Sequence, residues 1–309
     1  MIASRMTFLV VAVAATLLLG GVDASYDPSR AMNSLYFCKA SYCDHNAIAA
    51  WNCGESCSYH SNFVVQGVYT NGTFDAQGYS GYSPADDAII VAFRGSSNIP
   101  NWIADFDFKK MPYPDPSCPG GCEVHTGFFQ VYLELAEPLL RDVQTLVRNH
   151  PSSRMIVTGH SLGAAVSLHA GVDIQRKISG VNSLEVYNFG EPRVGNPAFA
   201  AWVTTVLPDG VQYRVTHEAD PVPHLPPMDF GFLHSPHELW YNNDGDTSYA
   251  NCADSATAES PACSDSTIPV DVSDHLLYLG VCTACSCSGF DVNQYKAMKL
   301  PAKRLRGGV

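Results

Sequence analysis

The five-residue sequence GHSLG at positions 159–163 constrains the fold of this chain more than any other segment. An apolar run at 155–158 precedes it, and an alanine-rich stretch follows it. A serine between two glycines, after a strand and before a helix, is typical of the tight turn that presents a nucleophilic hydroxyl above a sheet edge. The helix that begins at Leu162 offers backbone N–H groups where negative charge develops on an attacked carbonyl. We therefore predict that Ser161 is a nucleophile.

Strand-like and helix-like segments alternate along the chain. Apolar strands are predicted at 88–93, 155–158, 184–189 and 211–215, and helices at 31–43, 125–150, 162–178 and 197–206. Residues 62–94 favour antiparallel strands joined by a turn at Asn71-Gly72. Such an alternation is typical of a mixed, mostly parallel sheet covered by helices. The sequence therefore predicts one α/β domain.

The serine needs an acid that orients its base. In this kind of fold the acid follows the serine in the chain and lies at the carboxyl end of a strand. Asp220 meets both conditions and is fixed by the proline that follows it. Glu218 is the nearby alternative, and Asp229 is a poorer one inside an apolar loop. We predict that Asp220 is the acid.

The base must follow the acid in the chain, which leaves four histidines: His224, His234, His237 and His275. The first three come so soon after Asp220 that they would have to reach back within the same loop region. His275 arrives after more chain and is expected to open a helix-like apolar run. Position and order favour His275 as the base.

The N-terminus has the features of a secretory signal peptide. Arg5 is followed by a mostly apolar run to Leu19, and small residues lead to Ala24. The run is shorter than the ~20 apolar residues of a spanning helix. We predict cleavage after Ala24, leaving a secreted, extracellular protein in which Asn71 of Asn-Gly-Thr is a candidate glycan acceptor.

Eleven cysteines are too many for a reducing compartment. Local spacing predicts three disulfides that close loops: Cys53 with Cys57, Cys118 with Cys122, and Cys252 with Cys263. No Cys/His set has the spacing of a zinc finger, so no metal is expected. The odd number leaves at least one thiol free or intermolecular.

The charge of the chain excludes one class of partner. The formal net charge is −12, with only 18 lysines and arginines. Basic residues cluster only in the C-terminal tail, at Lys303, Arg304 and Arg306. Nucleic-acid binding is therefore not expected. An acidic surface keeps an extracellular protein soluble and repels acidic polymers.

Several segments together resemble the class 3 lipases of filamentous fungi, of the Rhizomucor and Thermomyces type. The resemblance covers residues 31–287 and rests on six sequences: FRGSS at 93–97, NWIAD at 101–105, GHSLG at 159–163, EPRVGNP at 191–197, VPHLPP at 222–227 and DHL at 274–276. It implies an α/β-hydrolase-type catalytic domain, assigned here to 25–287. It also implies a triad of Ser161, Asp220 and His275, with no cofactor.

The resemblance implies further roles. Ser96 would form the oxyanion hole with its backbone N–H and hydroxyl, opposite the N–H of Leu162. Cys43 would pair with a C-terminal cysteine, of which Cys285 is nearest in position. Other cysteines exceed the usual number of the family and leave the pairing open: Cys38, Cys282 and Cys287. The tail, residues 288–309, has no counterpart in the family, and we expect it to be disordered.

The segment after Ser96 carries an apolar face with helical spacing. Its members fall at i, i+3, i+4 and i+7: Ile99, Trp102, Ile103 and Phe106. In the lipases that the chain resembles, the corresponding helix is a lid over the nucleophile. We hypothesise that this helix hides its apolar face in water and swings out at an oil surface. Burying each large side chain in lipid would contribute about 1.5–3 kcal/mol.

These features predict a monomeric, secreted serine ester hydrolase that contacts lipid surfaces only peripherally. A triacylglycerol lipase fits best. A feruloyl or other cell-wall esterase is an alternative whose lid helix would be more polar, and Trp102 and Ile103 argue against it. A phospholipase A1 is a second alternative that the sequence does not exclude. An inactive secreted binding or effector protein would be a different class, and the intact triad weighs against it.

Overall fold

The structure is a computed structural model that describes residues 26–104, 106–208, 210–243, 245–268 and 271–288. The predicted signal peptide, 1–24, and residues 289–309 of the predicted tail lie outside this range. Among the described residues, no helix combines the length and apolar character needed to span a bilayer.

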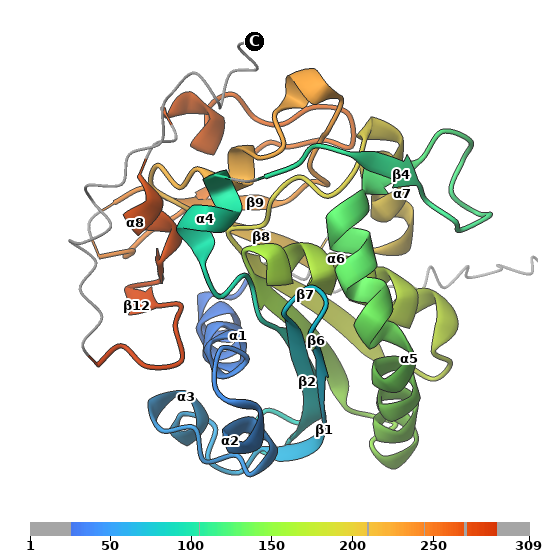
Figure 1. Ribbon diagram of the computed structural model, residues 1–309, viewed down its shortest axis with the longest axis vertical. Coiled ribbons are helices and arrows are strands. Elements are labelled where there is room, and N and C mark those ends of the chain that lie inside the picture. Colours follow the sequence, from blue (N-terminus) through green and yellow to red (C-terminus); the bar gives the residue numbers. More distant parts are fainter. Residues whose placement is uncertain (1–25, 105, 209, 244, 269–270, 289–309) are drawn as a thin grey trace, which may run out of the picture.

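The described residues form a central eight-stranded sheet (Figure 1). Its strands, in spatial order, are β1 (Val64–Asn71), β2 (Ala76–Ser83), β3 (Ala88–Phe93), β6 (Arg154–His160), β7 (Ser183–Phe189), β8 (Gln212–His217), β9 (Glu238–Tyr241) and β10 (Ala250–Asn251). The pairs from β3 to β9 are parallel, whereas β1, β2 and β10 join antiparallel. The predicted mixed, mostly parallel sheet of an α/β-hydrolase-type domain is confirmed.

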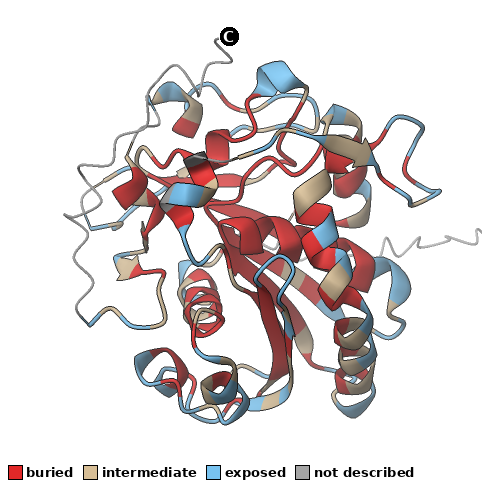
Figure 2. Cartoon of the chain, viewed as in Figure 1, coloured by how far each residue is buried: buried red, intermediate tan, exposed pale blue. Residues whose placement is uncertain are grey.

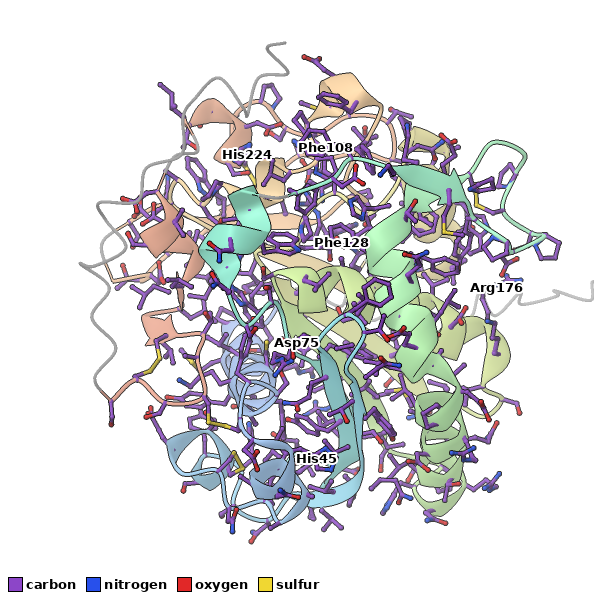
Figure 3. All side chains as sticks on the ribbon, viewed as in Figure 1. His45, Asp75, Phe108, Phe128, Arg176 and His224 are labelled. Atoms are coloured by element: carbon purple, nitrogen blue, oxygen red, sulfur yellow. A yellow bond between two sulfur atoms is a disulfide. The ribbon has the colours of Figure 1, made fainter. Side chains whose placement is uncertain are left out.

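Helices cover both faces of the sheet (Figure 1). Helix α1 (Pro28–Ala40) packs on one face, and α5 (Thr126–Asn149), α6 (Leu162–Lys177) and α7 (Pro197–Val206) pack on the other. Alternate residues of β3 serve the two layers, since Ile89 and Val91 pack with α5 and α6 while Ile90 packs with α1. The buried residues accordingly concentrate on the sheet and the inner helix faces (Figure 2), and side chains fill the space between the layers (Figure 3).

Shorter elements complete the fold. They are α2 (His45–Ala49), α3 (Glu55–Ser58), α4 (Ile99–Ala104), β4 (Lys110–Pro112), β5 (Glu123–His125), η1 (Val222–His224), η2 (Met228–Phe230), η3 (Ser264–Ser266), α8 (Val272–His275), β11 (Leu277–Tyr278) and β12 (Val281–Cys282). Two expectations were wrong in detail. Helix α1 starts earlier than predicted because Asp27 caps it, accepting from the N–H of Ser29 at 2.8 Å. His275 ends α8 instead of opening a helix, because the apolar run after it forms β11.

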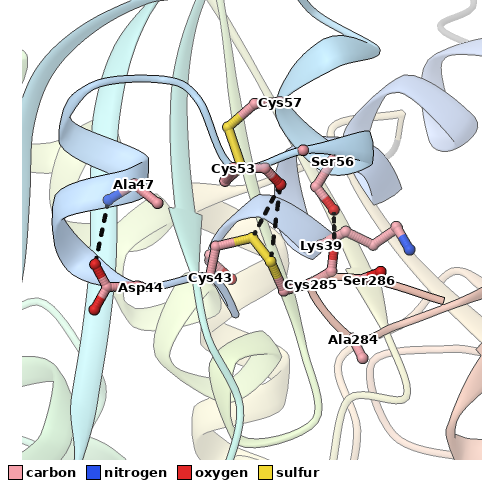
Figure 4. Close-up of a disulfide and its surroundings, with 12 residues drawn as sticks. Lys39, Cys43, Asp44, Ala47, Cys53, Ser56, Cys57, Ala284, Cys285 and Ser286 are labelled. Atoms are coloured by element: carbon pink, nitrogen blue, oxygen red, sulfur yellow. Dashed lines mark hydrogen bonds between the residues drawn. A yellow bond between two sulfur atoms is a disulfide. The ribbon is translucent and has the colours of Figure 1, made fainter. Parts of the chain in front are cut away.

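The described residues contain five disulfides: Cys43–Cys285, Cys53–Cys57, Cys118–Cys122, Cys252–Cys263 and Cys282–Cys287. Cys38 is a buried free thiol. The bond between Cys43 and Cys285 ties the segment after α1 to the C-terminal segment, where Ser56 Oγ also donates to the Cys285 carbonyl at 2.6 Å (Figure 4). The segment just beyond β12 is therefore covalently joined to the N-terminal part of the domain.

Candidate active site

Ser161 lies between the end of β6 and the start of α6, in the sharp turn that the sequence predicts. Its φ of 61° and ψ of −131° are a strained conformation for a residue with a side chain. Both flanking glycines are required by close backbone approach. A Cβ on Gly159 would lie 2.1 Å from the Gly163 carbonyl oxygen, and one on Gly163 would lie 2.4 Å from that of Phe93. The motif thus allows β3, β6 and α6 to pack closely enough to hold this turn.

Asp220 and His275 form a hydrogen-bonded pair near this sheet edge. Asp220 follows β8, and its Oδ2 accepts from His275 Nδ1 at 2.8 Å. Its Oδ1 accepts from the backbone N–H of Val222 at 2.8 Å, and the Tyr278 hydroxyl donates to Oδ2. Burial disfavours the Asp220 charge, but His275 and these hydrogen bonds outweigh it and hold the pKa of the carboxyl below its usual value. The anion therefore fixes the proton of His275 on Nδ1.

Two side-chain atoms of the predicted triad have no hydrogen-bond partner among the described residues, so Ser161 and His275 are not hydrogen-bonded to each other. They are Ser161 Oγ and His275 Nε2, and both residues are fully buried. Buried polar atoms without partners are uncommon and concentrate where function requires them. An unprotonated imidazole nitrogen beside a serine hydroxyl can accept its proton, and a carboxylate behind the imidazole can stabilise the resulting cation.

Three of the alternative acid and base candidates are exposed or have other partners. Asp229 is exposed on η2. His224 Nδ1 lies 3.1 Å from the carboxylate of Asp265, and His234 Nε2 donates to the Pro223 carbonyl at 2.8 Å. Of the candidates named from the sequence, His275 is the histidine that the structure pairs with Asp220.

A cavity of about 360 Å³ opens between α4, α5 and the start of α6. Its lining is mostly apolar: Phe74, Ser96, Asn98, Asn101, Trp102, Phe106, Asp107, His125, Gly127, Phe128, Val131 and Leu162. Ser96 and Leu162 thus face one space, as an oxyanion hole requires. The first-turn N–H of Leu162 has no intrahelical acceptor and is free to bind an anion.

Helix α4 covers the residues that flank the Asp220–His275 pair. Ile99 and Ile103 are buried, and they pack in one cluster with residues that follow Asp220 or surround His275: Val222, Leu225, Val272 and Leu276. The predicted fourth member, Phe106, lies beyond the helix, which ends at Ala104. Its ring still packs edge-on against Trp102, with 4.6 Å between centroids. The apolar surface is therefore formed by α4 together with the segment after it.

Known proteins are similar to this chain in sequence and in fold. A model of the family described as Lipase (class 3) matches residues 90–230. The lipase of Rhizomucor miehei is 37% identical over 239 residues, which are 76% of this chain and 63% of that lipase. The secreted mono- and diacylglycerol lipase 1 of Fusarium solani is 34% identical over 262 residues, 80% of this chain and 74% of the relative. The chain belongs to the class 3 lipase family.

Solved structures of lipases have a similar architecture. The triacylglyceride lipase of Rhizomucor miehei superposes with a TM-score of 0.76 at 34% identity, covering 84% of this chain and 96% of that one. Lipase II from Rhizopus niveus gives 0.75 at 30% identity, with coverages of 84% and 96%. The present chain nevertheless spans less than two thirds of the full Rhizomucor miehei lipase sequence that it matches.

A second histidine, His160, links His275 to the segment that precedes Ser96. Its Nε2 donates to the backbone carbonyl of His275 at 2.7 Å, and its Nδ1 accepts from the Tyr42 hydroxyl at 2.7 Å. The Tyr42 oxygen accepts from the N–H of Gly95, beside Ser96, at 3.0 Å. Burial and the neighbouring His275 hold the pKa of His160 well below its usual value, so the ring is neutral. Sequence reasoning missed Tyr42, His160 and Tyr278, because no local pattern marks contacts between segments this far apart.

One group in the described part of the chain has metal-like spacing: Glu238, Cys252 and Cys263. The two cysteines are joined in a disulfide, so the group offers one carboxylate and no thiolate. Such a set does not match the three or four ligands of a zinc site.

Proposed function

We propose that this chain is a secreted carboxylic ester hydrolase, and specifically a triacylglycerol lipase that acts at oil–water interfaces. The observation that carries the proposal is the buried His275 ring, which Asp220 orients through Nδ1 and whose Nε2, like Ser161 Oγ, has no hydrogen-bond partner among the described residues. The membership of the chain in the class 3 lipases supports the same assignment.

The proposed reaction is a two-step acyl transfer through the triad. His275 Nε2 takes the proton of Ser161 as Oγ attacks the ester carbonyl, and Asp220 stabilises the imidazolium that forms. The oxyanion is held by the N–H groups of Ser96 and Leu162. His275 returns the proton to the departing alcohol, which leaves Ser161 acylated. A water molecule, deprotonated by His275, then releases the acid and restores the serine.

The proposed lid is α4 with the segment that follows it. In water, Ile99 and Ile103 remain packed over the residues around His275. An oil surface offers these side chains and Trp102 an alternative apolar environment, so α4 would move away and open the cavity. Because acyl chains are apolar, they suit the walls that α5 contributes and that remain when α4 moves, which include Phe128 and Val131.

A second candidate substrate class is supported by the relatives. The proteins from Fusarium solani and Penicillium cyclopium are named as secreted mono- and diacylglycerol lipases. Partial glycerides are therefore the specific alternative to triacylglycerols. Rates on trioctanoin and on dioctanoin, measured under the same conditions, distinguish the two.

We further propose that residues 1–24 are removed as a signal peptide, that 25–287 form the catalytic domain and that 288–309 are a dispensable tail. Relatives named as secreted support export. N-terminal sequencing of protein collected from the medium of a eukaryotic host should begin at Ser25. Truncation after Cys287 should leave the rate on a dissolved ester unchanged.

The decisive experiment is the initial rate on tributyrin across its solubility limit. The wild-type rate should rise steeply as droplets appear, and Ser161→Ala should abolish turnover while Ser152→Ala, at an exposed serine, leaves it intact. Substantial activity in Ser161→Ala would exclude the proposed nucleophile. A rate that saturates below the solubility limit of tributyrin would instead indicate an esterase. Parallel assays with methyl ferulate and with phosphatidylcholine would detect a feruloyl esterase and a phospholipase A1, respectively.

A further inference from the structure

The turn between β1 and β2 contributes a wall to the cavity beside Ser96. Phe74 lies at the tip of this turn and lines the same space as Ser96, Leu162 and Phe128. In Figure 1 the turn lies at the upper end of β1 and β2, beside the start of α6, with which it shares the cavity. Phe74 is 40% exposed, so a large aromatic ring stands at the cavity in contact with water. A ligand that covers this ring would gain the free energy of removing it from water.

Hydrogen bonds to the strand that leads to Ser96 hold the tip in place. Arg94 Nη2 donates to the carboxylate of Asp75 at 2.6 Å and to the Asp75 carbonyl. The N–H of Arg94 donates to the Gln77 carbonyl at 2.9 Å. Since Gly95 and Ser96 follow Arg94 directly, the hydrogen bonds of Arg94 to Asp75 fix the position of the neighbouring Phe74 relative to the proposed oxyanion residue.

The residues that line the cavity therefore fall into two groups, one on the proposed lid and one on the rest of the fold. Trp102 and Phe106 belong to α4 and the segment after it, and they would leave with the lid. Phe74 is bound through Asp75 to Arg94, while Phe128 and Leu162 lie on the long helices α5 and α6. The second group stays in place whether the lid is closed or open.

We propose that Phe74 is a specificity-determining residue that contacts the acyl chain of the ester and favours longer chains over acetyl. The inference rests on the proposed ester hydrolysis. Leu162, the neighbour of Ser161 in the chain, lines the cavity, whereas Ser161 itself does not. An acetyl group on Ser161 is therefore too short to reach the far wall, and a longer chain would continue past Leu162 toward Phe74. The contact discriminates acyl length even in dissolved substrate, because it does not depend on an oil surface.

The test compares p-nitrophenyl acetate, butyrate and octanoate, each below its solubility limit. Phe74→Ala should lower kcat/KM for octanoate about tenfold, the loss expected when one large side chain no longer contacts the substrate. It should leave acetate within about twofold of wild type. Phe74→Leu should retain most of the octanoate rate, which separates loss of apolar contact from collapse of the turn. Phe230→Ala is the matched control, since Phe230 is 45% exposed and does not line the cavity.

A second pair of variants tests the attachment of the tip. Asp75→Ala removes the side-chain acceptor of Arg94 and should reproduce part of the octanoate loss. Asp75→Asn keeps an acceptor oxygen and tolerates the positive φ of 51° at this position, so it should behave as wild type.

Equal losses on all three esters in Phe74→Ala, or no loss on any, would overturn the specificity role while leaving the proposed function intact. The same loss in Phe230→Ala would overturn it too. A wild-type rate no higher than that of Ser161→Ala would overturn both proposals.

Discussion

Tyr278 donates its hydroxyl hydrogen bond to the same carboxylate oxygen of Asp220 that accepts from His275 Nδ1. One carboxylate oxygen of Asp220, the proposed acid, therefore accepts two hydrogen bonds, one from His275, the proposed base, and one from the neutral Tyr278 hydroxyl. Burial raises the pKa of the Tyr278 hydroxyl well above its usual value, and the Asp220 charge raises it further. The tyrosine therefore remains a proton donor throughout the working range of pH.

Tyr278→Phe should move the acid limb of the kcat/KM profile to higher pH. Without the hydroxyl, more negative charge remains on Asp220, which strengthens its bond to the imidazolium of His275. The Tyr278 hydrogen bond is also one of the interactions that hold the pKa of Asp220 below its usual value, so its loss raises that pKa. We expect the acid limb to move by about 0.5–1 pH unit, because part of one charge-assisted hydrogen bond is lost. The profile is measured on dissolved p-nitrophenyl butyrate. Tyr79→Phe removes another buried tyrosine hydrogen bond, to the Phe37 carbonyl, and should not move the limb.

Tyr42→Phe should lower kcat about tenfold on a dissolved ester while KM stays within twofold. The variant leaves His160 Nδ1 and the Gly95 N–H without their partner, which costs about 1–3 kcal/mol of stability and loosens the link between Ser96 and His275. Because His160 is neutral, the pH profile should keep its shape. Tyr36→Phe, on α1, serves as the control, and a raised KM with unchanged kcat would contradict the positioning role.

Trp102→Ala should weaken hydrolysis of emulsified tributyrin at least fivefold more than hydrolysis of dissolved p-nitrophenyl acetate. The ring is half-buried against Phe106 and Phe128, and its transfer to lipid would contribute about 1.5–3 kcal/mol to the open lid. Rates on both substrates, together with binding to droplets, measure the difference. Equal losses on the two substrates would argue that α4 is not a lid.

Glu259→Gln should reduce the free energy of unfolding at pH 7 by about 3 kcal/mol, because it leaves Arg193 buried beside a neutral amide. Arg193 binds Glu259 through Nε at 2.8 Å and Nη2 at 2.7 Å. Burial opposes the Glu259 charge, but His234 and Arg193 outweigh it and hold its pKa far below the usual value.

A depressed carboxyl pKa contributes stability that is present above the unfolded-state value near 4.3 and is lost as the pH falls below it. The difference in the free energy of unfolding between wild type and Glu259→Gln should therefore decrease as the pH is lowered from 5 to 2. Urea unfolding at each pH measures it. Glu137→Gln, at an exposed pair with Arg141, should change stability by less than about 1 kcal/mol.

Asn71→Gln should remove one N-linked glycan from protein secreted by a eukaryotic host. Asn71 ends β1, and its Oδ1 accepts from the N–H of Thr73 at 2.8 Å, which leaves the amide nitrogen available at an exposed turn. Mass spectrometry before and after enzymatic deglycosylation detects the change. Thr73→Ala should lose the glycan as well, and Thr73→Ser should keep it. An unshifted mass in secreted wild type would reject the site.

Local sequence patterns predicted the turns and helix ends whose conformation is determined by residues adjacent in the chain. The turn at Ser161 followed from two glycines between a strand and a helix, and α7 has the predicted bounds because Asn196 caps it before Pro197. The end of α4 before Phe106 did not follow, because apolar spacing continues past the point where the helix stops. The pairing of Tyr42 with His160 depends on how sheet and helices assemble, and no spacing in the sequence encodes it.

The disulfide between Cys43 and Cys285 also determines when, during synthesis and folding, the domain can reach its full stability. It encloses a ring with a sequence separation of 242, and Ser161, Asp220 and His275 all lie inside it. By chain entropy alone, such a ring disfavours the unfolded chain by about 5 kcal/mol. The second cysteine leaves the ribosome after every residue of the proposed triad. The covalent ring can therefore close only when synthesis of the whole catalytic domain proposed here is complete and an oxidant is present, so the final stabilisation of the fold waits for an oxidising environment.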